Sequence, residues 1–197
     1  IKAFRASEGM AFVEAMNQEV AATLIYGNSG LAPEEFTGLT PRYAAISGAT
    51  NGDNVISGGG AGPDNTSIWL VGWGDQTAHG LFPKGSKAGL SHEDFGEVTV
   101  EVTAGVGGTR MRAYQERWKW QVGLSVRDWR FCVRICNIDV SNLVAGTSAA
   151  DLPNLMIKAL YRIPNLRACK PAFYMSRTCW QMLDIQRRDD VISGGQL

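Results

Sequence analysis

Basic side chains alternate with large apolar ones in two segments of the sequence, and such segments can make ionic contacts with another surface. The segment 117–120 reads Arg-Trp-Lys-Trp, and Arg130 and Arg134 lie among apolar residues of the range 129–135. Neighbouring residues of a β-strand point to opposite faces, so each segment predicts a strand with one apolar and one basic face. In an assembly, a basic face can meet the carboxylates of a neighbouring molecule.

The same alternation suggests a second function, the binding of carbohydrate or nucleic acid by stacking on tryptophan rings. A stacking groove needs rings and cations on the same face, whereas the period of two in a strand separates them. We therefore expect Trp118 and Trp120 to lie in the core. A β-rich binding module remains the alternative if Trp69, Trp73, Trp118 and Trp120 are accessible to solvent.

An enzyme is the third possibility, and its site would be built from histidines and carboxylates. His79 and His92 are the two histidines, and His92 precedes Glu93 and Asp94, so these groups would have to converge in one pocket. The glycine-rich segments 58–62 and 84–89 lack the spacing of a phosphate-binding loop, and no Gly-x-Ser-x-Gly motif is present. We predict that the protein is not an enzyme and uses no cofactor or metal.

The cysteines are Cys132, Cys136, Cys169 and Cys179, and their spacing does not match the short pairs of zinc sites. We expect free thiols. Cys132 and Cys136 share one face of the predicted strand, where cysteine commonly serves as a small buried apolar residue.

Composition limits the classes of partner. The 197 residues include 19 basic and 19 acidic ones, so the formal net charge is zero and a dedicated nucleic-acid binder is disfavoured. No apolar run approaches the roughly 18 residues that a membrane span needs, and no secretory signal is present. We expect a soluble protein. Because the sequence starts at Ile1, we also expect a processed product or part of a longer chain.

The N-terminal segment predicts a long helix over 7–26, which Ser7 caps and which Gly27 ends in a left-handed conformation. Phe12, Met16 and Val20 recur every four residues and predict the packing face. The following residues 28–65 are rich in Gly, Pro, Ser, Asn and Asp, and we interpret them as an interaction loop.

A strand-rich region follows. The apolar run 68–73 predicts a strand that is covered on both faces, and 77–82 predicts the next strand. Valines alternate with polar residues over 97–102, which predicts one dry and one wet face. Glycines within 105–108 predict a chain reversal, and the parity of 129–135 places Trp129, Phe131, Val133 and Ile135 on one side.

The C-terminal segment predicts helices again. Apolar residues over 152–163 follow helical spacing, and Pro164 ends the run. The range 172–175 predicts a short buried strand. Ser176 is the expected cap of another helix over 177–186, whose inward residues include Cys179, Met182 and Leu183.

Several segments resemble the major capsid proteins of tailed double-stranded DNA phages. The resembling segments are Leu24–Gly27 with Phe36–Leu39, Asp64–Trp69, Gly80–Leu90, Val126–Arg130 and Asn137–Asp139. The second and third are long and unusual, so they are the most specific. The resemblance covers most of the chain.

The resemblance implies an α+β fold of the Hong Kong 97 type, with a peripheral domain, an axial domain, an extended loop and an N-terminal arm. It implies a spine helix and following loop over 1–42, a β-rich middle region over 43–140, and a helix-strand-helix region leading into the axial domain over 141–197. The arm and extended loop would precede Ile1, and further strands would follow Leu197, so the fold is expected to be incomplete at both ends.

The resemblance also implies a structural function. The protein would self-assemble as pentamers and hexamers into an icosahedral virion shell in the cytoplasm of a bacterial host, without contact to a membrane. Packaged DNA would lie non-specifically on the inner face, and scaffolding, portal and cement proteins are further candidate partners. The candidate contacts between subunits are Lys84, Lys87, Arg117, Lys119, Arg127, Asp128 and Arg130, for each of which an ordinary solvated charge is the alternative.

Overall fold

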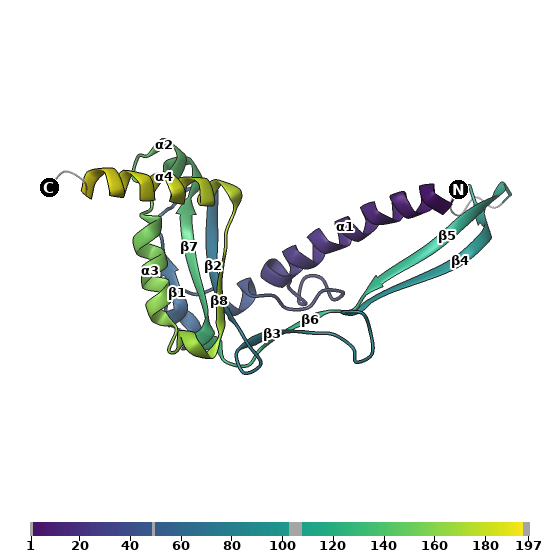
Figure 1. Cartoon of the computed structure of the whole chain (residues 1–197), viewed down its shortest axis with the longest axis horizontal. Helices are drawn as coiled ribbons and strands as arrows, with labels where there is room; N and C mark the ends of the chain where they lie inside the picture. The colour runs from purple at the N-terminus through teal and green to yellow at the C-terminus, as the bar shows by residue number, and fades with distance from the viewer. Residues whose placement is uncertain (1, 49, 103–107, 195–197) are drawn as a thin grey trace.

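A long helix lies beside a two-stranded ribbon, and both project from a mixed sheet that is covered by three shorter helices (Figure 1). The structure is a computed structural model that describes residues 2–48, 50–102 and 108–194. The long helix is α1 (Lys2–Tyr26), and the ribbon pairs β4 (Leu90–Glu101) with β5 (Arg110–Trp120) in antiparallel orientation. The predicted α+β class is therefore confirmed. None of the described helices is long and apolar enough to cross a membrane.

Helix α1 begins earlier than predicted and is mostly exposed. Ser7 lies inside the helix, so the predicted cap at Ser7 is wrong. Val13, Met16 and Val20 are half-buried, whereas Phe12, predicted on the packing face, is 62% exposed. A Cβ at Gly9 would lie 3.4 Å from the Trp118 ring, so close approach of α1 to the ribbon occurs at a glycine, which apolar spacing alone did not indicate.

Gly27 ends α1 for a different reason from the predicted one. Its φ is not positive. A Cβ at Gly27 would lie 2.5 Å from the carbonyl oxygens of Thr23 and Phe36, so close approach of two backbone segments requires glycine. The amide of Gly38 donates to the Gly27 carbonyl at 2.8 Å, and Leu39 donates to Leu24 at 3.1 Å. The chain therefore folds back along the end of the helix.

The segment predicted as an interaction loop contributes to the core. Leu39 and Tyr43 are buried, and strand β1 (Val55–Ser57) pairs in parallel with a central strand of the sheet. Short 3₁₀ helices cover Thr40–Tyr43 and Thr50–Asn54. Of the apolar residues in this polar segment, Leu39, Tyr43 and Val55 become buried, whereas Leu31 and Ile46 stay exposed.

The main sheet has six strands in the order β1-β7-β2-β3-β6, and β8 also pairs with β2. Strand β7 pairs antiparallel with β2 and parallel with β1. Strands β2 and β7 are buried on both faces, which confirms the predicted covered strand at 68–73. The bounds are β2 (Asn65–Trp73), β3 (Ala78–Leu81), β6 (Gly123–Val126), β7 (Cys132–Asp139) and β8 (Lys170–Tyr174).

Two apolar clusters lie on opposite faces of this sheet. Helices α2 (Val140–Ala145), α3 (Leu152–Arg162) and α4 (Arg177–Gly194) cover the first cluster, which contains Phe131 and Val133. The second contains Tyr43, Trp69, Cys132 and Cys136, with Trp129 packed against it. Trp129 therefore does not share the side of Phe131, because Trp129–Phe131 forms a 3₁₀ turn in which strand parity does not hold.

Arg134 is not part of a solvated basic face. Its guanidinium donates to the carbonyl of Tyr43 at 3.0 Å and to the Ser67 hydroxyl at 3.1 and 3.2 Å, and it lies 5.3 Å from the Trp69 ring centroid. These contacts hold the Arg134 guanidinium within the fold, where it does not face solvent as a basic surface. The predicted basic face of this strand is therefore wrong.

The ribbon shows the predicted alternation at Val98 and Val100, which are less exposed than Glu97 and Thr99, but Val102, predicted on the same dry face, is 54% exposed. Most of the predicted turn at 105–108 falls on residues 103–107, outside the described ones. The predicted division of the chain at 42/43 and 140/141 stays a prediction, and the strands of 43–140 are shared between the main sheet and the ribbon.

The C-terminal elements largely follow the predictions. The apolar face of α3 is buried, and the Ser176 hydroxyl accepts from the Cys179 amide at 3.3 Å at the start of α4, as expected for a cap. Helix α4 continues to Gly194, beyond the predicted end at 186. Strand β8 is a partly exposed edge strand, because among the described residues only β2 pairs with it, so its predicted burial is wrong.

Candidate interaction surface

The predicted contact residues form three exposed groups on the ribbon and at its junction with the main sheet. Arg117 and Lys119 project from one face of β5, and the pairs Glu93–Arg117 and Ser91–Lys119 lie opposite each other across the ribbon. This face is turned away from α1, because Glu116 and Trp118, which alternate with these cations, contact α1. A basic face on the ribbon is therefore present as expected.

Lys84 and Lys87 lie on an exposed loop that packs against the end of β5. The indole of Trp120 donates to the Ala88 carbonyl at 2.9 Å, and the amide of Gln121 donates to the Gly89 carbonyl at 3.0 Å. Gly89 has a φ of 83°, and a Cβ there would lie 2.0 Å from the Gln121 carbonyl oxygen. The loop is thus held against the end of β5, and both of its lysines are exposed.

Asp128 and Arg130 form a local ion pair at the corner after β6. The Asp128 carboxylate accepts from the Arg130 amide at 3.0 Å and from its guanidinium at 3.0 and 2.7 Å. The guanidinium, and then the amide, hold the pKa of Asp128 below its ordinary value. Arg127 lies beside this pair and contacts Gln76 at 3.5 Å. This ion pair caps the Trp129–Phe131 turn, while Arg130 stays exposed.

The tryptophans predicted for the core behave differently from one another. Trp69 is buried, whereas Trp118 and Trp120 are half-buried on the ribbon. Trp118 stacks on the His92 ring with centroids 4.0 Å apart, and Trp73 packs edge-on against Tyr174. The core prediction for Trp118 and Trp120 is therefore wrong, because a two-stranded ribbon is too thin to bury them. The four rings lie on two elements, Trp69 and Trp73 on β2 and Trp118 and Trp120 on β5, and Trp69 is buried, so they do not form one exposed platform.

A charged cluster that the sequence did not suggest joins α1 to the ribbon. Arg5 of α1 pairs with Asp94 at 2.8 Å and with Glu116 at 2.5 Å, and its guanidinium lies 4.7 Å from the Tyr114 ring centroid. His92 contacts the other carboxylate oxygen of Glu116 at 3.0 Å. The Gly96 amide, and then Arg5, hold the pKa of Asp94 below its ordinary value. We call Arg5, His92, Asp94, Tyr114 and Glu116 the α1 clasp.

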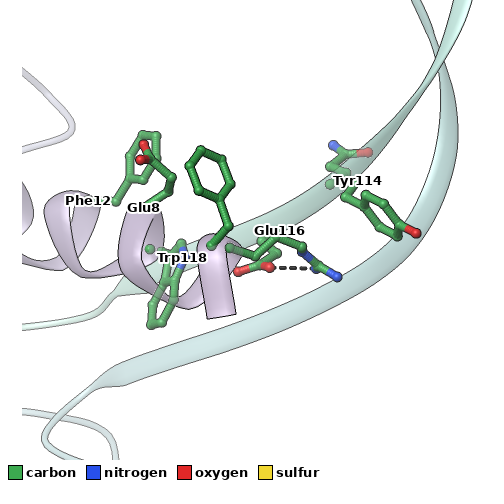
Figure 2. Close-up of a pocket in the computed structure, with 9 residues that line it drawn as sticks. Glu8, Phe12, Tyr114, Glu116 and Trp118 are labelled. Atoms are coloured by element: carbon green, nitrogen blue, oxygen red, sulfur yellow. Dashed lines mark ion pairs between the residues drawn. The ribbon is translucent and has the colours of Figure 1, made fainter. Parts of the chain in front are cut away.

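The surface is hollowed at two places beside α1 at the clasp, and we call the two hollows together the groove. Hollows of about 340 and 330 Å³ flank Trp118, and Figure 2 shows Glu116 and Trp118 from β5 against the helix, from which Glu8 and Phe12 project. Phe4 and Met10 are 70% and 74% exposed beside the groove. Arg5 and Asp94 are 89 residues apart, so no local pattern could have indicated this site.

The groups proposed for a catalytic or metal site do not converge. His79 lies in β3 of the main sheet, whereas His92 lies in β4 of the ribbon. Within the described ranges, no group of three or more His, Cys, Asp or Glu residues could hold a metal ion. The four cysteines are free, and all except Cys169 are buried, which confirms the expectation for the thiols.

Comparison with known proteins gives two matches that agree. The chain matches a family model described as Major capsid protein GP7 over residues 1–194. A chain in a near-atomic-resolution cryo-EM structure of bacteriophage epsilon15 is 35% identical, with a TM-score of 0.66. The match covers 93% of this chain and 56% of that chain, so this chain spans little more than half the length of the epsilon15 chain. No curated protein matches.

The structure joins a long helix and a ribbon to a mixed sheet. The matches confirm that this is the predicted Hong Kong 97-type phage capsid fold. The chain belongs to the major capsid protein family GP7.

Proposed function

We propose that this chain is a shell-forming structural protein, which assembles in many copies into the icosahedral capsid around phage DNA. The match to a major capsid protein family over residues 1–194 is the observation that carries the proposal. Such a protein acts through interfaces rather than through a catalytic centre, so it needs neither enzyme activity nor a cofactor.

The surface of the isolated chain supports this proposal. Helix α1 leaves Phe4, Met10 and Phe12 largely in water, and the ribbon leaves Phe95 and Met111 about half exposed. Exposed apolar side chains gathered on two neighbouring elements are typical of surfaces that a partner covers. A single copy therefore leaves contacts to be made by its neighbours.

We further propose that the seven charged residues named above are contacts between subunits. Arg117 and Lys119 are the strongest pair, because they lie on the ribbon face opposite α1 and form no ion pair with any described residue. Rim charges of this kind mainly steer association and lose strength as salt screens them. Asp128 and Arg130 already pair within the chain, so their contribution to a contact is expected to be smaller.

Pentamers and hexamers of the chain are the proposed building blocks. Packaged DNA, scaffolding, portal and cement proteins are proposed partners, with assembly in the host cytoplasm. A net charge of zero means that DNA contact would be non-specific and weak.

The test is assembly of the full chain, followed by light scattering and negative-stain imaging. Particles of several hundred ångströms, or pentamers and hexamers that join into them, are the expected result. A variant with Arg117→Glu and Lys119→Glu should assemble more slowly than Arg130→Glu, with a difference that shrinks at high salt. A chain that stays monomeric under all assembly conditions would contradict the proposal and favour a binding module.

A further inference from the structure

A third hollow lies away from the α1 clasp and the predicted contact residues. Its volume is about 420 Å³, and it is bounded by the C-terminal end of α1, the start of β2 and the turn from β8 into α4. All the residues that line it are uncharged, although 19% of the whole chain is charged. An uncharged lining favours an occupant without charged side chains, since a charge placed there would lose water without gaining a partner.

One wall of the hollow is an unpaired strand edge. Strand β2 pairs with β7 from Asn65 onward, but on its other side it pairs with β8 only from Trp69 to Trp73. Strand β8 ends at Tyr174, and Ser176 then caps α4, so the chain leaves the sheet at this point. Residues 65–68 have no strand partner on this side among the described residues. Ile68 is fully buried, whereas Asn65 is exposed and Thr66 and Ser67 are half-buried, so residues 65–67 are the open part of this edge. An open edge can accept an added strand through main-chain hydrogen bonds.

Hydrogen-bond donors without acceptors also line the hollow. Trp69 is 1% exposed, and its indole N–H has no partner among the described residues. The Tyr174 and Ser176 oxygens accept from Trp73 at 2.7 Å and from Cys179 at 3.3 Å, and their hydroxyl protons have no acceptor within the described part of the chain, although both residues are exposed to water. A buried donor without a partner is costly, and the carbonyl groups of an extended peptide are suitable acceptors.

Aromatic side chains surround the same hollow. Tyr26 is 61% exposed and Trp180 is 55% exposed, and they belong to α1 and α4. Rings that stand in water around a concave surface are typical anchors for an apolar side chain of a partner. The hollow thus combines a free strand edge, unused donors and an aromatic rim.

We propose that this hollow binds an extended, uncharged strand from a second copy of the chain, which pairs with the free edge of β2. The inference rests on the proposed function, because in a shell of one protein the neighbour is the same chain. The chain itself carries a segment of suitable chemistry: residues 44–48 read Ala-Ala-Ile-Ser-Gly and are exposed.

The experiment places the photo-cross-linker p-benzoylphenylalanine at Tyr26 in the full chain. Particles and the unassembled fraction are irradiated separately, and cross-linked peptides are identified by mass spectrometry. The expected result is a cross-link between two copies that joins position 26 to an uncharged segment. Cross-links confined to one copy, to another protein or to a glycan would overturn the inference, as would the absence of any cross-link.

Variants of Trp180 test the inference independently through the yield of the cross-link. Trp180→Arg places a charge at the rim and should lower the yield of cross-link about tenfold, whereas Trp180→Phe should preserve it. Both variants should keep the unfolding temperature of the parent, because Trp180 is exposed. Equal yields from the two variants would contradict the inference.

The two proposals can fail separately. If particles form without a cross-link between copies, the inference fails and the shell function stands. If no particles form but a cross-link joins two copies in the unassembled fraction, the inference stands and the shell function fails.

Discussion

Burial sets the reactivity of the four cysteines at the scale of single residues. Desolvation raises the pKa of Cys132 to about 11 and also raises the pKa of Cys136. The thiolate is the reactive form, so these thiols are both inaccessible and protonated at neutral pH. Cys169 is only partly buried, although burial raises its pKa as well.

We therefore expect selective labelling of the unassembled chain by iodoacetamide at pH 8. Cys169 should react first, and Cys132 should react only after unfolding. Peptide mapping after timed labelling measures the order, with labelling in denaturant as the control. Labelling of Cys132 as fast as Cys169 in the folded chain would show that the second apolar cluster is not closed as described.

Asp64, also at the scale of single residues, makes a pH-dependent contribution to the stability of the fold. Its carboxylate accepts from the amide of Ser141 at 2.8 Å at the start of α2, and hydrogen bonds from the hydroxyl and amide of Ser141 hold its pKa below the ordinary value. A carboxyl group with a lowered folded-state pKa stabilises the fold above its unfolded pKa, near 4, and that stabilisation is lost as pH falls through the folded value.

Asp64→Asn should therefore lower the unfolding temperature at pH 7, and the difference from the parent should narrow as pH falls toward 3. Thermal unfolding followed by circular dichroism from pH 7 to pH 3 measures this, with Asp75→Asn as the exposed control. A difference that stays constant with pH would mean that the charge of Asp64 contributes nothing.

At the scale of elements, glycine packing fixes how α1 leaves the main sheet. A Cβ at Gly27 would meet backbone oxygens of Thr23 and Phe36, and a Cβ at Gly38 would meet the same Thr23 oxygen. These contacts are shorter than van der Waals distance and involve backbone, which cannot rotate away as a side chain can. The direction of α1 thus depends on two positions without side chains.

Gly27→Ala should lower the free energy of unfolding by about 1–3 kcal/mol, the usual cost of overpacking. Urea titration followed by tryptophan fluorescence measures it. Gly80→Ala is the matched control, because a methyl group there would lie 4.0 Å from the Gly123 carbonyl oxygen, an ordinary van der Waals contact. Similar midpoints for both variants would contradict the close approach at Gly27.

At the scale of the whole molecule, the two parts of the fold differ in how they are stabilised. Strands β2 and β7 are buried on both faces between two apolar clusters, whereas the ribbon has α1 on one face only. A two-stranded ribbon alone is marginally stable in water. The α1 clasp joins the N-terminal part of α1, where Arg5 lies, to the ribbon. It should therefore govern how often this part of α1 separates from the ribbon.

Hydrogen exchange should therefore be faster in β4 and β5 than in β2 and β7 of the unassembled chain. Arg5→Gln should speed exchange near Asp94 and leave β7 unchanged. In assembled particles, the ribbon should gain more protection than β7, because neighbours cover it. Mass spectrometry of exchanged peptides measures all three, and uniform exchange along the chain would contradict this view of the fold.

The sequence by itself determined the features that depend on neighbours along the chain. The periodicity of α3, the covered strand at 68–73 and the cap at Ser176 are local patterns, so they were predictable. The basic face of Arg117 and Lys119 also followed from strand parity. The resemblance of segments such as Gly80–Leu90 led to the family, which the comparisons confirm.

Only the tertiary structure decided the features that join residues far apart. It placed Arg134 inside the fold, moved Trp129 to the second cluster, and left Trp118 half-buried against α1. It also brought Arg5 to Asp94 and left the edge of β2 unpaired at residues 65–68. The physical reason is that burial, ion pairing and edge exposure depend on which surfaces meet in space, and no local spacing encodes that meeting.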